Sequence, residues 1–202
     1  MRNKKIDFVG FHHGNRYVDF VQLLWLFNSP RETRNIIRLD LHEAGLLYKY
    51  ASKVAAGNIL EIGRYWAGST VLLAVATHEK VMTKVISIDC IEGCHDPDAD
   101  DWLNEYPWKN RIDIRVDNSH TMENLPLSML FVDGDHSYEG IKKDFYHHWN
   151  YLHGPCLCHD YNELTTPGVT KFIDEFVKDG YAEIIEQEGT MIALRKLKDY
   201  EF

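Results

Sequence analysis

Long apolar runs are missing from this chain of 202 residues. No segment approaches the roughly 20 apolar residues that a membrane-spanning helix needs. Residues 1–7 also lack the apolar stretch of a secretion signal. Together these absences argue against a membrane or secreted protein and predict a cytoplasmic one.

Cysteine is scarce as well, and its positions are uneven. The cysteines are Cys90, Cys94, Cys156 and Cys158. They are too few and too clustered for a disulfide framework in a chain of this length. With His95 and His159 they offer zinc-ligand types, but neither pair has the C-x-x-C spacing typical of structural zinc sites. We therefore expect reduced thiols.

Basic residues are outnumbered by acidic ones. The chain has 22 Lys and Arg against 31 Asp and Glu, which gives a formal net charge of -9. Such a surface repels phosphate backbones and anionic lipid headgroups. Neither nucleic acid nor a membrane is therefore expected as a partner.

Repeats, low-complexity tracts and Gly/Ser-rich linkers are absent too, so one domain is expected. From about Asp40 onward, short apolar runs alternate with segments of helical periodicity, which predicts right-handed crossovers and a parallel sheet. The predicted strands are 58–62, 84–89, 112–116, 128–132 and 155–158, and the predicted helices after the first strand are 68–78, one near 98–106, 138–151 and 168–178.

The alternation ends at residues 181–186 and 191–195, which flank a turn containing Gly189 and predict a hairpin. The expected fold is α/β: a doubly wound, Rossmann-like, mostly parallel sheet of seven strands with an antiparallel C-terminal strand, in which the hairpin gives an antiparallel edge strand. Residues 40–202 would form the catalytic domain. Residues 1–39 show no clear periodicity and are expected to serve as a lid or as an oligomer contact, which leaves a homo-oligomer open.

A glycine-containing turn follows the first strand. Glu61, Gly63, Gly68 and Ser69 lie where the strand passes into a helix, and Asp89 ends the next strand. Glycine lets the backbone approach a ligand, and the start of a helix offers free N–H groups to an anion. A carboxylate at Asp89 would lie beside the crevice of such a sheet. A plain strand-to-helix turn is the alternative interpretation.

Polar side chains also follow the fourth and fifth predicted strands. Asp133, Asp135 and His136 come directly after residues 128–132, and His159 and Asp160 follow residues 155–158. Neighbouring parallel strands deliver these groups to one edge of the sheet. Crowding carboxylates and imidazoles is unfavourable unless a cation or a substrate uses them.

The register of Glu61, Gly63, Gly68 and Asp89 resembles the first motif of class I S-adenosylmethionine (SAM)-dependent methyltransferases, E-x-G-x-x-x-G, followed by an acidic residue that ends the second strand. Ala67 stands where related sequences often have glycine. The resemblance implies SAM as the cofactor, bound by the residues of this motif. The implied SAM-binding residues are Glu61, Gly63, Gly68, Ser69, Asp89, Ser119 and Asp133.

Two further motifs narrow the resemblance. D-G-D-H-S-Y-E-G from Asp133 and H-D-Y from His159, with P-G-V from Pro167, resemble the methyltransferase family related to cephalosporin-hydroxylase-type and macrolide-sugar O-methyltransferase proteins, over about residues 40–195. The resemblance implies methyl transfer to a hydroxyl of a sugar or another small molecule. It also implies a divalent cation, such as magnesium or manganese, held by Asp133, His159 and Asp160. His159 departs from the pattern, because a carboxylate is usual there, and an imidazole suits Mn²⁺, Fe²⁺ or Zn²⁺ better than Mg²⁺.

A base is needed to take the proton from the acceptor hydroxyl. His136 is the expected base, because a neutral imidazole accepts a proton near neutral pH. Asp135 is the competing candidate, and His136 could instead only anchor its loop.

Two other functions stay open on the sequence alone. Asp133-Gly134-Asp135 is a D-x-D triplet of the kind that holds Mn²⁺ and a diphosphate in nucleotide-sugar glycosyltransferases, although that function leaves the glycine turn unexplained. A methyltransferase-like module that binds SAM without turnover is the non-catalytic alternative.

Overall fold

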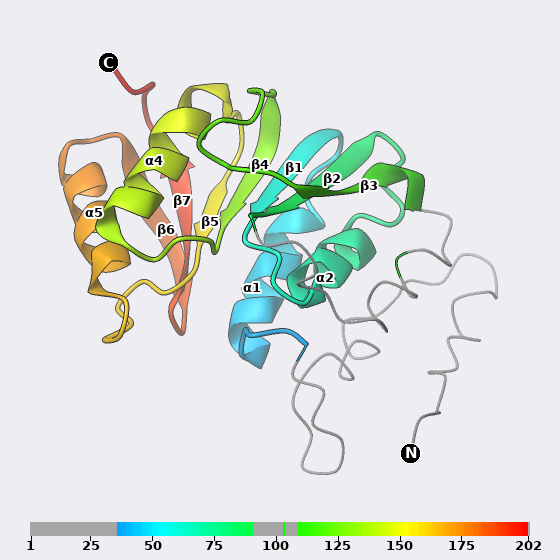
Figure 1. The fold of residues 1–202 in the computed structure, drawn as a ribbon, viewed down its shortest axis with the longest axis horizontal. Coiled ribbons are helices and arrows are strands. Elements are labelled where there is room, and N and C mark those ends of the chain that lie inside the picture. Colours follow the sequence, from blue (N-terminus) through cyan, green and yellow to red (C-terminus); the bar gives the residue numbers. More distant parts are fainter. Residues whose placement is uncertain (1–35, 91–102, 104–108, 202) are drawn as a thin grey trace, which may run out of the picture.

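The computed structural model describes residues 36–90, 103 and 109–201, and these form a sheet of seven strands in the order β3-β2-β1-β4-β5-β7-β6 (Figure 1). The first five strands run parallel. The predicted doubly wound α/β fold is therefore confirmed. The strands are β1 (Gly57–Ile62), β2 (Thr83–Asp89), β3 (Ile112–Val116), β4 (Leu127–Val132), β5 (Cys156–Cys158), β6 (Ala182–Glu188) and β7 (Met191–Lys196).

The predicted antiparallel C-terminal strand is confirmed, and the strand at this edge of the sheet is antiparallel to its neighbour. β7 lies between β5 and β6 and runs antiparallel to both, so β6 is the edge strand. The reason is burial: Met191, Ile192, Ala193 and Leu194 are all fully buried, whereas most of β6 is partly or fully exposed. An apolar strand gains most from a position with neighbours on both sides.

Among the described residues, two pairs of helices enclose the sheet. In Figure 1, α1 (Leu41–Ala51) and α2 (Gly68–Ala76) lie on one side of the sheet, while α4 (Tyr138–His148) and α5 (Pro167–Lys178) lie on the other. The predicted helix 138–151 is divided, because α4 ends at His148 and a 3-10 turn, η4 (Trp149–Tyr151), follows. A second 3-10 turn, η3 (Lys109–Arg111), precedes β3.

Each face of the sheet has its own apolar core. Ile59 and Phe131 pack with α1 and α2, whereas the adjacent residues Leu60 and Val132 pack with α4 and α5. Side chains alternate between the faces of a strand, so covering both faces requires continuous apolar runs. This explains why the strands could be located from the sequence.

Some expectations fall outside the described residues. The helix predicted near 98–106 is described only at Leu103, which is buried. Residues 1–35 and the Cys94–His95 pair also lie outside the described ranges. Within those ranges, no helix is long and apolar enough to cross a membrane.

Candidate functional site

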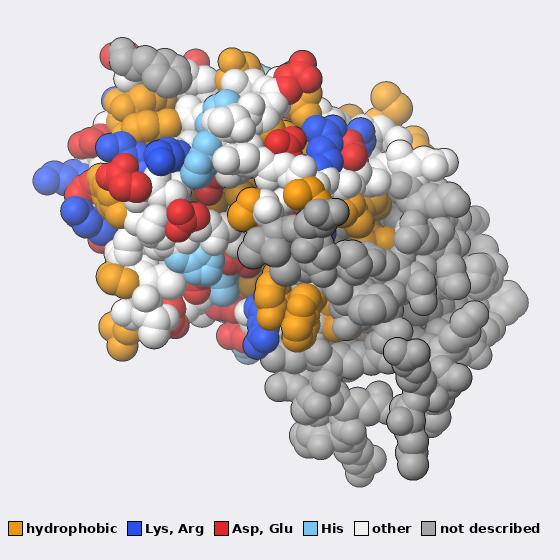
Figure 2. All heavy atoms as spheres, viewed as in Figure 1, with side chains coloured by type: hydrophobic (Ala, Val, Ile, Leu, Met, Phe, Trp, Pro, Cys, Tyr) orange, Lys and Arg blue, Asp and Glu red, His pale blue; other side chains and the backbone are white. Residues whose placement is uncertain are grey.

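The carboxyl ends of the parallel strands open into a cavity of about 790 Å³. This edge includes the point where the chain, after building outward from β1 to β3, reverses to place β4 on the other side of β1, and ligands of open α/β sheets bind at such points. On the face drawn in Figure 2, Asp and Glu side chains lie among His side chains toward the middle. Every predicted site residue except Glu61 lines the cavity: Gly63, Gly68, Ser69, Asp89, Ser119, Asp133, Asp135, His136, His159 and Asp160.

The turn between β1 and α2 depends on glycine at two positions. Gly63 has a φ of +90°, and a Cβ there would lie 2.0 Å from the carbonyl oxygen of Asp133. A Cβ at Gly68 would lie 2.6 Å from the backbone of Ile37. Ala67, which stands where glycine was expected, adopts a left-handed φ of 65°. The turn therefore keeps the glycine-type conformation despite the substitution.

Glu61 supports this turn from beneath. The side chain is fully buried and accepts a hydrogen bond of 2.5 Å from the hydroxyl of Thr70 in α2. Burial raises the pKa of the Glu61 carboxyl, although nearby hydroxyl groups that donate to it act in the opposite direction. Glu61 does not line the cavity, so its placement differs from the expected contact with the cofactor. Its position links β1 to the start of α2.

Asp89 joins the turn to the end of β2. One carboxylate oxygen accepts hydrogen bonds from the backbone N–H groups of Arg64, at 3.1 Å, and Tyr65, at 2.9 Å. The Arg64 guanidinium, whose role could not be predicted, is buried and donates to the carbonyl oxygens of Ser87 and Arg115. These contacts fix the turn against β2 and β3 and hold Asp89 at the cavity wall.

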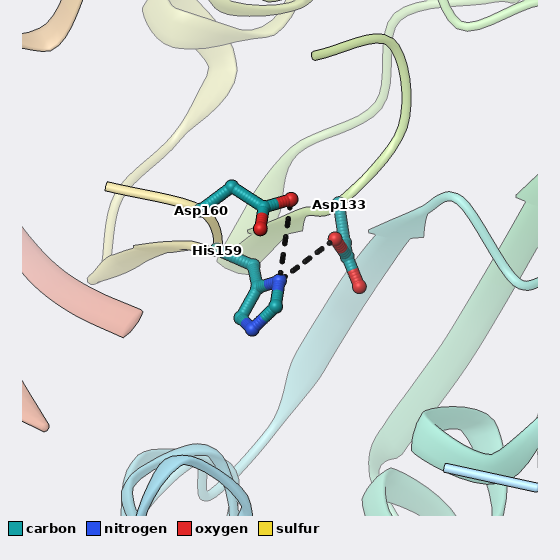
Figure 3. A group of neighbouring side chains, drawn as sticks. All are labelled: Asp133, His159 and Asp160. Carbon is teal, nitrogen blue, oxygen red and sulfur yellow. Dashed lines mark ion pairs between the residues drawn. The ribbon is translucent and has the colours of Figure 1, made fainter. Parts of the chain in front are cut away.

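Three predicted metal ligands converge at the ends of β4 and β5. Figure 3 shows Asp133 and Asp160 pointing toward the same ring nitrogen of His159. The His159 Nδ1 atom lies 3.3 Å from Asp133 Oδ1 and 3.4 Å from Asp160 Oδ2. One ligand atom from each residue lies within 4.8 Å of the others. One nitrogen and two oxygen donors are therefore arranged around a common point.

Glu43, from the first turn of α1, stands on the other side of His159. Glu43 Oε2 lies 3.3 Å from His159 Nε2, and Oε1 accepts hydrogen bonds of 2.8 Å from the backbone and hydroxyl groups of Thr190. The sequence motif D-x-x-E predicts only a capping box with Asp40, which is also formed. The contact with His159 could not be found from that local pattern.

These carboxylates create a strong demand for positive charge. Burial alone would lower the pKa of His159, but hydrogen bonds with Asp133, Asp160 and Glu43 raise it to about 12. Burial alone would raise the pKa of Glu43, but hydrogen bonds from His159, Asp40 and Thr190 lower it to about 2. Either a proton on the imidazole or a cation between the carboxylates can meet this demand.

His136, the predicted base, lies beside the same cluster. Its Nδ1 atom is 2.8 Å from Asp160 Oδ2, and its Nε2 atom is 3.7 Å from Asp133 Oδ1. The hydrogen bond with Asp160 raises the pKa of His136, against the opposing effect of burial. Asp135 instead accepts a hydrogen bond from the backbone of Ser137, and this bond lowers its pKa. The competing carboxylate is thus engaged in shaping its own loop.

Ser119 reaches the wall through the loop after β3. Its carbonyl oxygen lies 2.9 Å from Nε2 of His148 in α4. His120 Nε2 lies 3.1 Å from the buried Asp144 carboxylate, also in α4. The loop that carries Ser119 is therefore held by α4.

Comparisons with known proteins agree with this architecture. The sequence model of a family described as a methyltransferase domain matches residues 60–161. No curated protein shows a significant sequence match to the chain.

Several solved structures share the fold at low sequence identity. The structure of the O-methyltransferase NovP has a TM-score of 0.67 and 14% identity, covering 86% of this chain and 88% of its own. The Bacillus cereus O-methyltransferase in complex with SAH has a TM-score of 0.59 and 15% identity, covering 94% and 96%. The SAH-bound Podospora anserina methyltransferase PaMTH1 has a TM-score of 0.61 and 13% identity, covering 98% of each chain.

Proposed function

Because the chain belongs to a family of methyltransferase domains, we propose that it transfers the methyl group of SAM to a hydroxyl oxygen of a sugar or another small molecule. The family and the fold confirm the class I methyltransferase predicted from the sequence. The observation that carries the proposal is the convergence of the glycine turn and the histidine–carboxylate cluster on one cavity wall. The first suits the cofactor, and the second suits an acceptor that must lose a proton.

The cofactor would occupy the part of the cavity beside β1 and β2. A volume of about 790 Å³ lies within the range of roughly 300–1,000 Å³ for small-molecule sites. Gly63 and Gly68 leave room for close backbone approach, and Asp89 places a carboxylate where ribose hydroxyls can donate to it. The first turn of α2 suits the carboxylate of the methionine part.

A divalent cation is part of the proposal. Asp133, His159 and Asp160 supply the donors, and the surplus of negative charge around His159 favours a cation. An imidazole among the ligands favours Mn²⁺, Fe²⁺ or Zn²⁺ over Mg²⁺. When bound, such an ion would make a nearby hydroxyl easier to ionise.

The remaining chemistry needs positioning and a base. The new bond joins the acceptor oxygen to the methyl carbon while the bond from that carbon to sulfur breaks, which leaves S-adenosylhomocysteine (SAH). The hydroxyl proton passes to His136, whose side chain is partly exposed at the cavity wall beside Asp133 and Asp160. The cavity must also hold the acceptor oxygen in line with the methyl carbon. Such positioning lowers the barrier, because the two reactants no longer have to meet by diffusion.

Calorimetry with SAH tests the cofactor assignment. We expect the wild-type protein to bind SAH and the Asp89→Ala variant to bind it at least about tenfold more weakly, which corresponds to about 1.4 kcal/mol. Binding of a nucleotide sugar without binding of SAH would instead favour a glycosyltransferase. SAH binding without turnover of sugar and phenol acceptors would favour a non-catalytic module.

Chelation tests the cation separately. We expect prolonged chelation to abolish methyl transfer, Mn²⁺ to restore it, and the Asp160→Ala variant to need more Mn²⁺ for the same rate. Full activity after chelation, together with unchanged activity of Asp160→Ala, would remove the metal from the mechanism.

A further inference from the structure

We infer that Glu43 is a positioning residue that fixes the tautomer of His159 and so directs the Nδ1 lone pair toward the proposed cation. The inference rests on the cation site proposed above. It adds a specificity role for a residue on α1, outside the motifs that identify the family. Three segments far apart in the sequence meet to build this arrangement: the start of α1, the end of β5 and the turn between β6 and β7.

Glu43 is held rigidly. Its side chain is buried, and its carboxylate accepts hydrogen bonds of 2.8 Å from the backbone of Asp40 and from the backbone and hydroxyl of Thr190. A Cβ at Gly189 would lie 2.6 Å from Glu43 Oε1, so the turn also packs closely against the carboxylate. A carboxylate with this many fixed donors has a defined orientation toward its remaining neighbour, His159.

When a cation among the carboxylates takes the place of a second ring proton, His159 is neutral and has a choice between two tautomers. A neutral imidazole donates from one ring nitrogen and accepts at the other. An ionised carboxylate can only accept, so Glu43 Oε2, 3.3 Å from His159 Nε2, favours the proton on Nε2. Thr190 does not oppose this, because its hydroxyl donates to Glu43 and can accept from Nε2 at 3.2 Å.

A proton fixed on Nε2 leaves a lone pair on Nδ1, on the opposite side of the ring. With the proton on Nε2, the Nδ1 lone pair faces the oxygens of Asp133 and Asp160 at 3.3 and 3.4 Å. Three electron-rich atoms facing one another repel unless a cation lies among them. Carboxylates that orient ligand histidines in this way raise metal affinity. Glu43 thereby selects a cation that accepts nitrogen ligation, such as Mn²⁺, over Mg²⁺.

Substitution of Glu43 by glutamine keeps the shape and replaces one acceptor by a donor. The amide can donate to Nε2, which moves the ring proton to Nδ1 and blocks the lone pair. We expect calorimetry to show Mn²⁺ binding to Glu43→Gln about 10–100-fold weaker than to the wild type. SAH affinity should stay within about twofold, because Glu43 does not line the cavity.

A matched control is available at a second carboxylate that contacts α1. Glu186 of β6 pairs with Lys49 and Tyr50 of α1, so Glu186→Gln also alters a carboxylate bound to α1, but without contact to His159. This variant should bind Mn²⁺ as the wild type does. Equal weakening in both variants would show that Glu43 acts only through the position of α1, and would overturn the inference.

The His159→Asp background separates tautomer control from packing. Without an imidazole there is no tautomer to fix, so Glu43→Gln should not weaken Mn²⁺ binding in this background, and Mg²⁺ should gain affinity relative to Mn²⁺. Weakening by the same factor in both backgrounds would overturn the role of Glu43 while leaving the cation site intact. No Mn²⁺ binding by the wild type would instead overturn the proposed cation, and with it this inference.

Discussion

At the level of single residues, the proposed chemistry depends most on the strength of His136 as a base. The hydrogen bond with Asp160 raises the pKa of this imidazole, which makes its neutral form a stronger base. Asp135 has the opposite character, because the hydrogen bond from Ser137 lowers its pKa and weakens it as a base. Their environments therefore shift the pKa values of two adjacent candidate bases, Asp135 and His136, in opposite directions.

The first prediction concerns removal of that imidazole. General-base catalysis usually contributes about 10²–10⁴-fold, so His136→Ala should lower turnover by roughly this factor. SAH affinity should stay nearly constant, because the residue acts on the acceptor. Steady-state kinetics and calorimetry on the same preparation check both parts.

Asp135→Asn serves as the comparison for this prediction. Asparagine retains an oxygen that can accept the hydrogen bond from Ser137, so the loop should keep its shape. We expect only a few-fold loss of turnover. The opposite pattern, a large loss in Asp135→Asn and a small one in His136→Ala, would assign the base to Asp135.

Two glutamates show where residue-level prediction from the sequence ends. The position of Glu61 within the glycine motif predicted contact with the cofactor, yet the side chain turns inward to Thr70. Glu43 fits a local capping box so well that the sequence offers no reason to seek a second role. Its contacts with His159 and Thr190 depend on tertiary packing between distant segments.

At the level of elements, the turn between β1 and α2 is the feature that tolerates substitution least. The Gly63 N–H donates to the carbonyl oxygen of Ile88, and the Asp133 N–H donates to that of Ile62. The backbones at the carboxyl ends of β1, β2 and β4 thus meet at one point, and any side chain at Gly63 would separate them. The same contact places Asp133 beside the part of the cavity that we propose for the cofactor.

The second prediction compares two glycines that share a positive φ. Gly63→Ala puts a Cβ 2.0 Å from a backbone oxygen, so it should cost roughly 3 kcal/mol or more and abolish SAH binding. Gly180 has a φ of +76° with nothing within 4 Å, so Gly180→Ala should cost only about 1 kcal/mol and leave binding unchanged. Urea unfolding and calorimetry measure the two effects. Equal costs would mean that backbone conformation, and not the close approach, determines the requirement at Gly63.

The strands were predictable because burial on both faces produces continuous apolar runs such as Ile59–Leu60 and Leu130–Phe131. The order of the strands at the C-terminal end of the sheet was not predictable, because the hairpin of β6 and β7 can join the sheet through either strand. The relative burial of the two strands decides the outcome, and that burial depends on packing against β5. Sequence periodicity predicts that a strand exists, but it does not predict which strand it pairs with.

At the level of the full chain, acidic groups outnumber basic ones. The chain carries a formal net charge of -9, and several carboxylates converge on one cavity. The α4 helix contributes a buried imidazole, that of His148. Burial lowers the pKa of His148 to about 4, with the nearby His147 and His120 acting in the same direction. The neutral ring nonetheless lies 2.9 Å from the carbonyl oxygen of Ser119 at the cavity wall.

The last prediction follows from this buried imidazole. A histidine has a pKa near 6.5 when unfolded, and that of His148 is about 4 in the folded protein. Between these values the unfolded chain binds more protons, so stability falls as pH falls through this window. His148→Gln keeps a donor for the Ser119 carbonyl but does not titrate, so its free energy of unfolding should fall less between pH 7.5 and 4.5, by up to about 2–3 kcal/mol. Urea unfolding of both proteins at the two pH values gives the difference directly, and other titrating groups cancel in it. Parallel curves would contradict a neutral, buried His148, whereas a flatter curve for the variant would identify the contact between α4 and the Ser119 loop as the acid-sensitive support of the cavity wall.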